Sequence, residues 1–154
     1  MNNLFTYYEG DLVDFIDKAS KSPGYFIKCV ISTVEIDLVE MLCSCGIELD
    51  YTWKHTLDNC AVSHILKVHG SDKELLRGQA PVTVTDLVQI HDIVEAYDTI
   101  AVEKNRRAQD IIIYSKKVGE VITYYVEEVR LGRHELAAST MYKRKKENSP
   151  TLMG

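Results

Sequence analysis

The period of the hydrophobic pattern changes near Asp110, and this change most restricts how the chain can fold. Before Asp110, apolar residues mostly recur every three to four positions, as in amphipathic helices. After it, apolar and polar residues alternate along three segments, residues 111–115, 121–129 and 134–142. Alternation with a period of two predicts antiparallel strands, and a glycine-containing turn follows each of the first two segments. We therefore expect an α+β fold in which N-terminal helices pack on an antiparallel β-sheet.

The first part of the chain carries several helix signals and one strand signal. A run rich in β-branched and aromatic residues predicts a buried strand over residues 25–31. Asp11 predicts the cap of a first short helix, which residues 21–24 end. A second helix is predicted between the capping-box pattern Ser32-x-x-Glu35 and Gly46, and a third from Leu57 to His69, opened by Thr56 and closed by Gly70. Thr85 predicts the cap of another short helix, and a further helical turn is predicted over residues 92–96.

Length and composition predict one globular domain. The chain has 154 residues, 45% of them hydrophobic and 27% charged, and no Pro/Gly/Ser-rich linker divides it. We assign residues 1–24 to an N-terminal helix, 25–145 to the main body and 146–154 to a disordered tail.

The N-terminus lacks a basic segment followed by an apolar block, and no run is long enough to cross a bilayer. We expect a cytoplasmic protein without membrane contact.

The four cysteines lack metal-ligand spacing. No Cys-x-x-Cys pair occurs, and each cysteine lies in an apolar run, which favours buried structural thiols in a reducing compartment. Cys43 and Cys45 could in principle join His64 and His69 in a zinc site, but Cys-x-Cys on a helix directs its thiols about 200° apart. We therefore expect neither a metal nor a cofactor.

Two histidines, His64 and His69, are the first candidates for chemistry, because an imidazole can gain and lose a proton near neutral pH. The apolar stripe of their predicted helix consists of Leu57, Ala61, Ile65 and Val68. His64 falls within about 40° of the centre of this stripe, and His69 about 100° away from it. We expect His64 to point at the sheet, where the alternative is a hydrogen-bonded core histidine. His69, at the C-terminus of the helix, could act as an acid or bind a phosphate, or it could simply cap the helix.

The last predicted strand and the loop after the histidines add further polar candidates. Alternation places Thr140 and Tyr142 on one face of the strand, where hydroxyls can donate to a phosphate or an oxyanion; ordinary half-exposed strand positions are the alternative. Arg77 could clamp a phosphate with two hydrogen bonds. Residues 143–146 form a basic run in a chain of net charge −5, either a solvated tail or a contact to RNA phosphates. Tyr124 and Tyr125 face opposite sides, so at most one of them can stack on a base.

The order of these motifs resembles that of a known nuclease superfamily. The series is His64-x4-His69-Gly70, Arg77-Gly78-Gln79-x-Pro81-x-Thr83, Asp86, Ile90-x-Asp92-Ile93-Val94 and, after the hairpin, Ser139-Thr140-Met141-Tyr142-Lys143. Over about residues 25–145 it resembles the phage-associated members of the barnase–EndoU–colicin–RelE-like nucleases, abbreviated PBECR. The resemblance implies helices followed by a curved antiparallel sheet, with the active site in the concavity of the sheet.

The resemblance also implies an activity and its residues. Such nucleases cut RNA without a metal, by attack of the ribose 2′-OH on the adjacent phosphorus to give a 2′,3′-cyclic phosphate. The expected catalytic residues are His64, His69, Thr140 and Tyr142, and the expected substrate-binding residues are Arg77, Lys67 and Lys143. The acidic balance of the chain leaves room for a narrow substrate such as one tRNA.

Three functional hypotheses remain open at this point. The first is an RNA-cleaving effector of a phage or mobile element, which an inhibitor or immunity protein could hold in check. The second is a non-catalytic binding module that holds a protein or nucleic-acid partner in a cleft between His64 and Arg77. The third is a small metal-dependent hydrolase that uses His64, His69 and an acidic residue such as Asp72.

Overall fold

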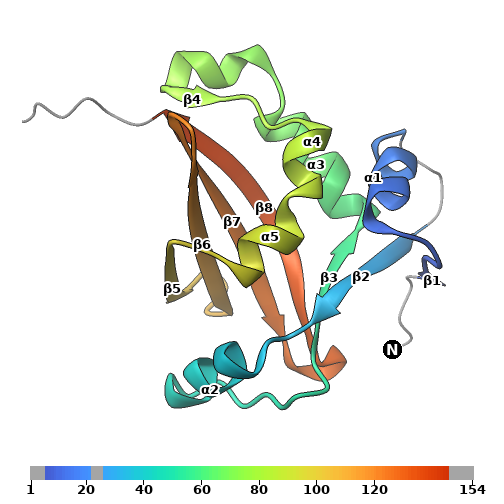
Figure 1. The fold of residues 1–154 in the computed structure, drawn as a ribbon, viewed down its shortest axis with the longest axis vertical. Helices are drawn as coiled ribbons and strands as arrows, with labels where there is room; N and C mark the ends of the chain where they lie inside the picture. The colour runs from blue at the N-terminus through green and yellow to red at the C-terminus, as the bar shows by residue number, and fades with distance from the viewer. Residues whose placement is uncertain (1–5, 22–25, 146–154) are drawn as a thin grey trace, which may run out of the picture.

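The computed structural model describes residues 6–21 and 26–145. Within these ranges the strands form one open eight-stranded sheet in the order β1-β2-β3-β8-β7-β6-β5, and β4 pairs with β8 (Figure 1). The strands are β1 (Thr6–Tyr7), β2 (Ile27–Thr33), β3 (Lys54–Asp58), β4 (Gln79–Ala80), β5 (Thr99–Lys104), β6 (Asp110–Val118), β7 (Val121–Arg130) and β8 (Glu135–Lys145). Helices and sheet together confirm the α+β class.

The sheet is mixed, so the expectation of a wholly antiparallel sheet is wrong on one side. The long strands β5 to β8 pair antiparallel, as the alternating pattern predicts. Next to them, however, β3 runs parallel to β8, and β1 runs parallel to β2. A parallel neighbour needs a long connection, and the whole chain from α3 to β7 lies between β3 and β8.

The helices give the sheet one covered face and one open face. They are α1 (Leu12–Ser20), α2 (Ile36–Ser44), α3 (Asn59–His69), α4 (Val84–Val88) and α5 (Ile90–Glu95), with short 3-10 helices η1 (Asp72–Arg77) and η2 (Leu131–Arg133). In Figure 1, α1, α3, α4 and α5 gather on one side of the long strands. The covered face carries the fully buried Ile112, Tyr125 and Met141, whereas the partly exposed Tyr124 and Tyr142 lie on the open face.

Several predicted boundaries are wrong. Thr56 does not open a helix, because residues 54–58 form β3; α3 starts at Asn59, where the Asp58 side chain accepts a hydrogen bond from the Ala61 amide at 2.7 Å. Ser32 lies in β2 rather than in a capping box, and Glu35 makes no side-chain cap bond. The capping box that does form joins Thr83 to Asp86, two residues before the predicted cap.

Most of the cysteines are exposed, contrary to the prediction. Of the four cysteines only Cys29 is buried; Cys43, Cys45 and Cys60 are exposed, so the expectation of four buried thiols is wrong for three of them. The predicted tail over 146–154 and most of the turn over 21–24 lie outside the described residues. None of the helices in the described ranges is long and apolar enough to span a bilayer.

A buried polar network centred on His55 lies inside the covered face. Nδ1 of His55 is 2.8 Å from Glu127, Nε2 is 3.1 Å from Glu35, and the ring is fully buried. Tyr114 and Tyr125 donate their hydroxyls to Glu127 at 2.6 and 3.0 Å. Burial alone would lower the pKa of His55, but Glu127 and Glu35 outweigh this effect and raise it to about 9. His55 is therefore held as an imidazolium between two carboxylates.

Candidate functional site

A polar cluster forms where the end of α3, η1 and β4 meet the C-terminal half of β8. On this edge of β8, β3 pairs with residues 135–137, and β4 pairs near the other end, where Gln79 lies opposite Arg144 and Ala80 opposite Lys143. The turn from η1 into β4 passes through Gly78, whose φ of 72° is the left-handed conformation that glycine adopts without strain. The Val82 amide then donates to the carbonyl of His69 at 2.7 Å, which fixes the end of α3 against this segment.

The centre of the cluster is His69, held by a buried carboxylate. Its Nδ1 is 2.5 Å from Oε1 of Glu74, a side chain with no exposed surface. Because a carboxylate only accepts, Nδ1 carries the hydrogen, and Nε2 is the ring nitrogen left to exchange a proton. Arg77 donates to Oε2 of Glu74 at 3.3 Å. The Gln79 side-chain amide lies beside the same carboxylate, and its nitrogen donates at 3.1 and 3.2 Å once the amide is rotated so that its nitrogen rather than its oxygen faces Glu74. These donors compensate the burial of the Glu74 charge.

Aromatic rings of the open face adjoin His69. The centroid of the His69 ring lies 5.8 Å from that of Tyr142, which in turn stacks on Tyr124 at 5.0 Å and 13°. The Arg144 guanidinium lies 5.9 Å from the centroid of each tyrosine ring. Burial raises the pKa of Tyr142, and nearby Arg144 lowers it in part. The Tyr142 hydroxyl therefore remains a donor at neutral pH.

Thr140 precedes Tyr142 by two residues on the same face of β8. Its Oγ1 is buried and makes no hydrogen bond within the part of the chain that the structure describes. A buried hydroxyl without a partner is uncommon in native proteins, and the donor and acceptor capacity of Thr140 Oγ1 is unused among the described residues.

His64 does not lie with His69, and the expectation that it faces the sheet is wrong. The side chain is exposed, about 105° around α3 from the centre of the buried face of Ala61, Val62 and Ile65. The predicted stripe was misplaced because Leu57 belongs to β3 and Val68 is 39% exposed. With the true stripe, it is His69 that lies on the inner side of the helix.

The two expected substrate-binding lysines also lie apart from the cluster. Lys67 is exposed on α3. Lys143 points to the covered face, where its Nζ is 2.8 Å from Asp86 of α4. Arg77 is the exception among the expected substrate-binding residues, because it touches Glu74 and keeps 59% of its side chain exposed. The structure therefore groups His69, Arg77, Thr140 and Tyr142, and separates His64, Lys67 and Lys143 from them.

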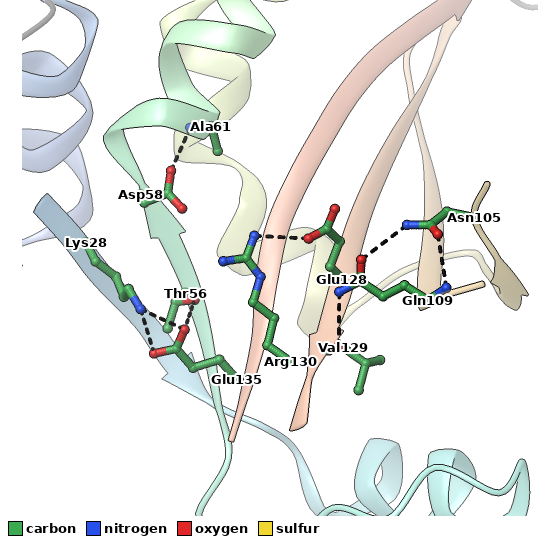
Figure 2. A network of polar contacts seen from close by, with 10 residues as sticks. All are labelled: Lys28, Thr56, Asp58, Ala61, Asn105, Gln109, Glu128, Val129, Arg130 and Glu135. Atoms are coloured by element: carbon green, nitrogen blue, oxygen red, sulfur yellow. Dashed lines mark hydrogen bonds and ion pairs between the residues drawn. The ribbon is translucent and has the colours of Figure 1, made fainter. Parts of the chain in front are cut away.

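A second polar network, unpredicted from the sequence, lies at the start of β8 (Figure 2). The Nζ of Lys28 is 2.9 and 3.1 Å from the two oxygens of Glu135, and both side chains are almost wholly buried. Thr56 and Tyr7 also donate to Glu135, at 3.3 and 2.9 Å. These contacts tie β1, β2 and β3 to β8, and the closed arrangement of donors around Glu135 favours a structural role.

No metal site is assembled in the described part of the chain. Within residues 6–21 and 26–145, no three histidine, cysteine or carboxylate side chains lie close enough together to hold a metal ion. Neither the Cys43, Cys45, His64 and His69 set nor the set that adds Asp72 to the two histidines is therefore formed.

The sequence did not single out Glu74. It indicated Tyr124 only as one of two tyrosines that could stack on a base, and Arg144 only as part of a basic run, without placing either beside His69. Glu74 stands in a polar segment, where a charged residue is ordinarily exposed, so nothing local indicates that it is buried. Tyr124 and Arg144 join the site through the pairing of β7 with β8, which places Tyr124 opposite Tyr142.

Comparison with known proteins agrees with the resemblance seen in the sequence. A model of the family described as phage-Barnase-EndoU-ColicinE5/D-RelE like nuclease3 matches residues 34–149, most of the chain and all of the cluster around His69. Searches of curated proteins and of solved structures gave no significant match. The chain belongs to this PBECR nuclease family.

Proposed function

We propose that the chain is a metal-independent endoribonuclease whose proton-transfer group is His69. The observation that carries this proposal is the contact of the His69 ring with both a fully buried Glu74 and the open-face Tyr142. A carboxylate on Nδ1 fixes the tautomer and orientation of an imidazole, so that Nε2 can take and return a proton. Membership of a nuclease family supplies the phosphodiester as the class of bond.

The reaction is an internal transesterification. The Nε2 of His69 takes the proton of the ribose 2′-OH while O2′ attacks the adjacent phosphorus, and the bond from phosphorus to O5′ breaks. Nε2 returns this proton to O5′, so that one product ends in a 5′-OH and the other in a 2′,3′-cyclic phosphate. Because nucleophile and phosphorus belong to the same nucleotide, alignment in the site supplies much of the rate.

The cationic and hydroxyl groups around His69 suit the charge that develops on the phosphate oxygens. Arg77 is exposed next to Glu74, and Arg144 lies beside Tyr142. Tyr142 and Thr140 provide hydroxyls from the same strand face, and donors fixed in position stabilise a transition state more than the ground state. We assign substrate positioning to the two arginines and donation to the two hydroxyls.

The test compares two histidines of the same helix. Purified protein should cleave total RNA in the presence of EDTA and leave cyclic-phosphate ends. His69→Ala should lower the rate about 10²- to 10⁴-fold, the usual contribution of a general acid or base. The matched control His64→Ala should keep wild-type activity, because His64 is exposed on another side of α3. Equal loss in both variants, or full activity in His69→Ala, would contradict the assignment.

In the cell we propose an effector of a phage or mobile element that cuts tRNA or mRNA in the cytoplasm and that an inhibitor protein could restrain. Expression of the wild type, but not of His69→Ala, should then arrest bacterial growth. Absence of RNA cleavage together with retained RNA binding would favour the binding module instead.

A further inference from the structure

Two tyrosines form a stacked pair on the open face, beside the proposed reaction centre. Tyr124 of β7 lies directly opposite Tyr142 of β8, and their rings stack at 5.0 Å with an angle of 13° between the planes. The neighbouring Tyr125, in contrast, is fully buried on the covered face and donates its hydroxyl to Glu127. The pair on the open face is only partly buried.

The hydroxyl groups of the pair differ from those of the buried tyrosines. Within the described residues neither the Tyr124 nor the Tyr142 hydroxyl makes a hydrogen bond to the protein, unlike those of Tyr114 and Tyr125. The Arg144 guanidinium lies 5.9 Å from both ring centroids and is exposed to solvent. Aromatic faces next to an exposed guanidinium are the combination that binds single-stranded nucleic acid, by stacking on bases and by attraction to phosphates.

We propose that Tyr124, Tyr142 and Arg144 form a subsite for an unpaired nucleobase of RNA, close to the scissile phosphate. The choice of RNA rests on the proposed function, since the centroid of the His69 ring is 5.8 Å from that of Tyr142. A base in a duplex has both faces covered by its neighbours, so only a base in a loop or a single strand can stack here. The site therefore selects single-stranded RNA for cleavage.

The test measures binding without cleavage. A short fluorescein-labelled 2′-O-methyl RNA cannot undergo 2′-OH attack, and an abasic oligomer with the same backbone lacks only the bases. By fluorescence anisotropy, the wild type should bind the first oligomer roughly 5- to 150-fold more tightly than the second, the range expected for one stacked base. Annealing the first oligomer to its complement should remove this preference.

Variants then assign the preference to the tyrosines. Tyr124→Leu should lose most of the preference, and Tyr124→Phe should keep it because the ring remains. Tyr51→Leu is the matched control, a tyrosine that is 57% exposed in the loop before β3. Far-UV circular dichroism and thermal melting verify that each variant is folded. Arg144→Gln should weaken both oligomers alike.

The outcomes separate the two proposals. If the wild type binds both oligomers equally, or if Tyr124→Leu retains the preference, the subsite is wrong even where RNA is cleaved. If the wild type prefers the base-bearing oligomer but cleaves no RNA, the subsite stands and the ribonuclease proposal falls.

Discussion

Replacing His55 with glutamine should remove a large part of the pH dependence of folding stability. In the native protein both ring nitrogens of His55 contact buried or half-buried carboxylates, and its pKa is raised to about 9. An unfolded chain would return this pKa to its ordinary value near 6.5. A group whose pKa is raised on folding contributes its full stabilisation below the unfolded value, and it loses this contribution as the pH rises through the folded value.

The size of the effect follows from the two pKa values. A difference of about 2.5 units, at 1.36 kcal/mol per unit, corresponds to about 3 kcal/mol at most. This contribution should be complete below about pH 6.5 and absent above about pH 9. For a domain whose net stability is on the order of 5–15 kcal/mol, such a loss is easily measured.

Urea unfolding at several pH values between 6 and 9.5 provides the assay. The single tryptophan, Trp53, is 3% exposed, so its fluorescence reports unfolding. His55→Gln should be less stable than the wild type, because it leaves Glu127 without its main partner, but its stability should decline much less between these pH values. His91→Gln, which alters a histidine on the surface, should follow the wild type. A decline of equal size in His55→Gln and the wild type would refute the reasoning.

Three further predictions concern the candidate site and its support. Glu74→Gln should lower kcat for RNA cleavage about 10- to 100-fold, because Nδ1 of His69 then lacks its carboxylate partner. Single-turnover cleavage measures this rate, and an unchanged kcat would contradict the role given to Glu74. Lys28→Met should cost about 3–5 kcal/mol in urea unfolding, whereas adding Glu135→Leu should restore most of it, since the unpaired buried carboxylate is then removed. Gly78→Ala should destabilise by about 1 kcal/mol, because φ is 72° there, and a melting temperature equal to that of the wild type would show that the turn tolerates a side chain.

The sequence predicts the elements whose pattern is local and misses those that depend on distant pairing. The three long strands follow from alternation alone, and their hairpin turns were also found. In contrast, β3 is only five residues long and buried at four of them, so it carries no alternation that would separate it from the helix that follows. Its strand conformation comes from pairing with β2 and β8, which lie far away along the chain.

One boundary error explains the misplacement of the histidines. Treating Leu57 as helical extended α3 toward the N-terminus and rotated its apparent apolar stripe toward His64. Asp58 was the available signal for the true start of α3, because Asp is among the best N-cap residues. The residue after an N-cap is the first residue of the helix, here Asn59. From that start the inner side contains Ala61, Val62 and Ile65, and the position of His69 follows.

The environments of the five histidines allow an argument by elimination. His55 has both ring nitrogens occupied in the core, so it cannot reach a substrate. His91 pairs with Glu95 on the surface, and His134 stacks on Trp53 at the opposite end of β8 from Tyr142. His64 is exposed, and no carboxylate of residues 6–21 or 26–145 hydrogen-bonds its ring. His69 alone among the five combines one nitrogen bound to a buried carboxylate with a ring against the open face, and these are the two properties that proton transfer to a bound phosphodiester requires.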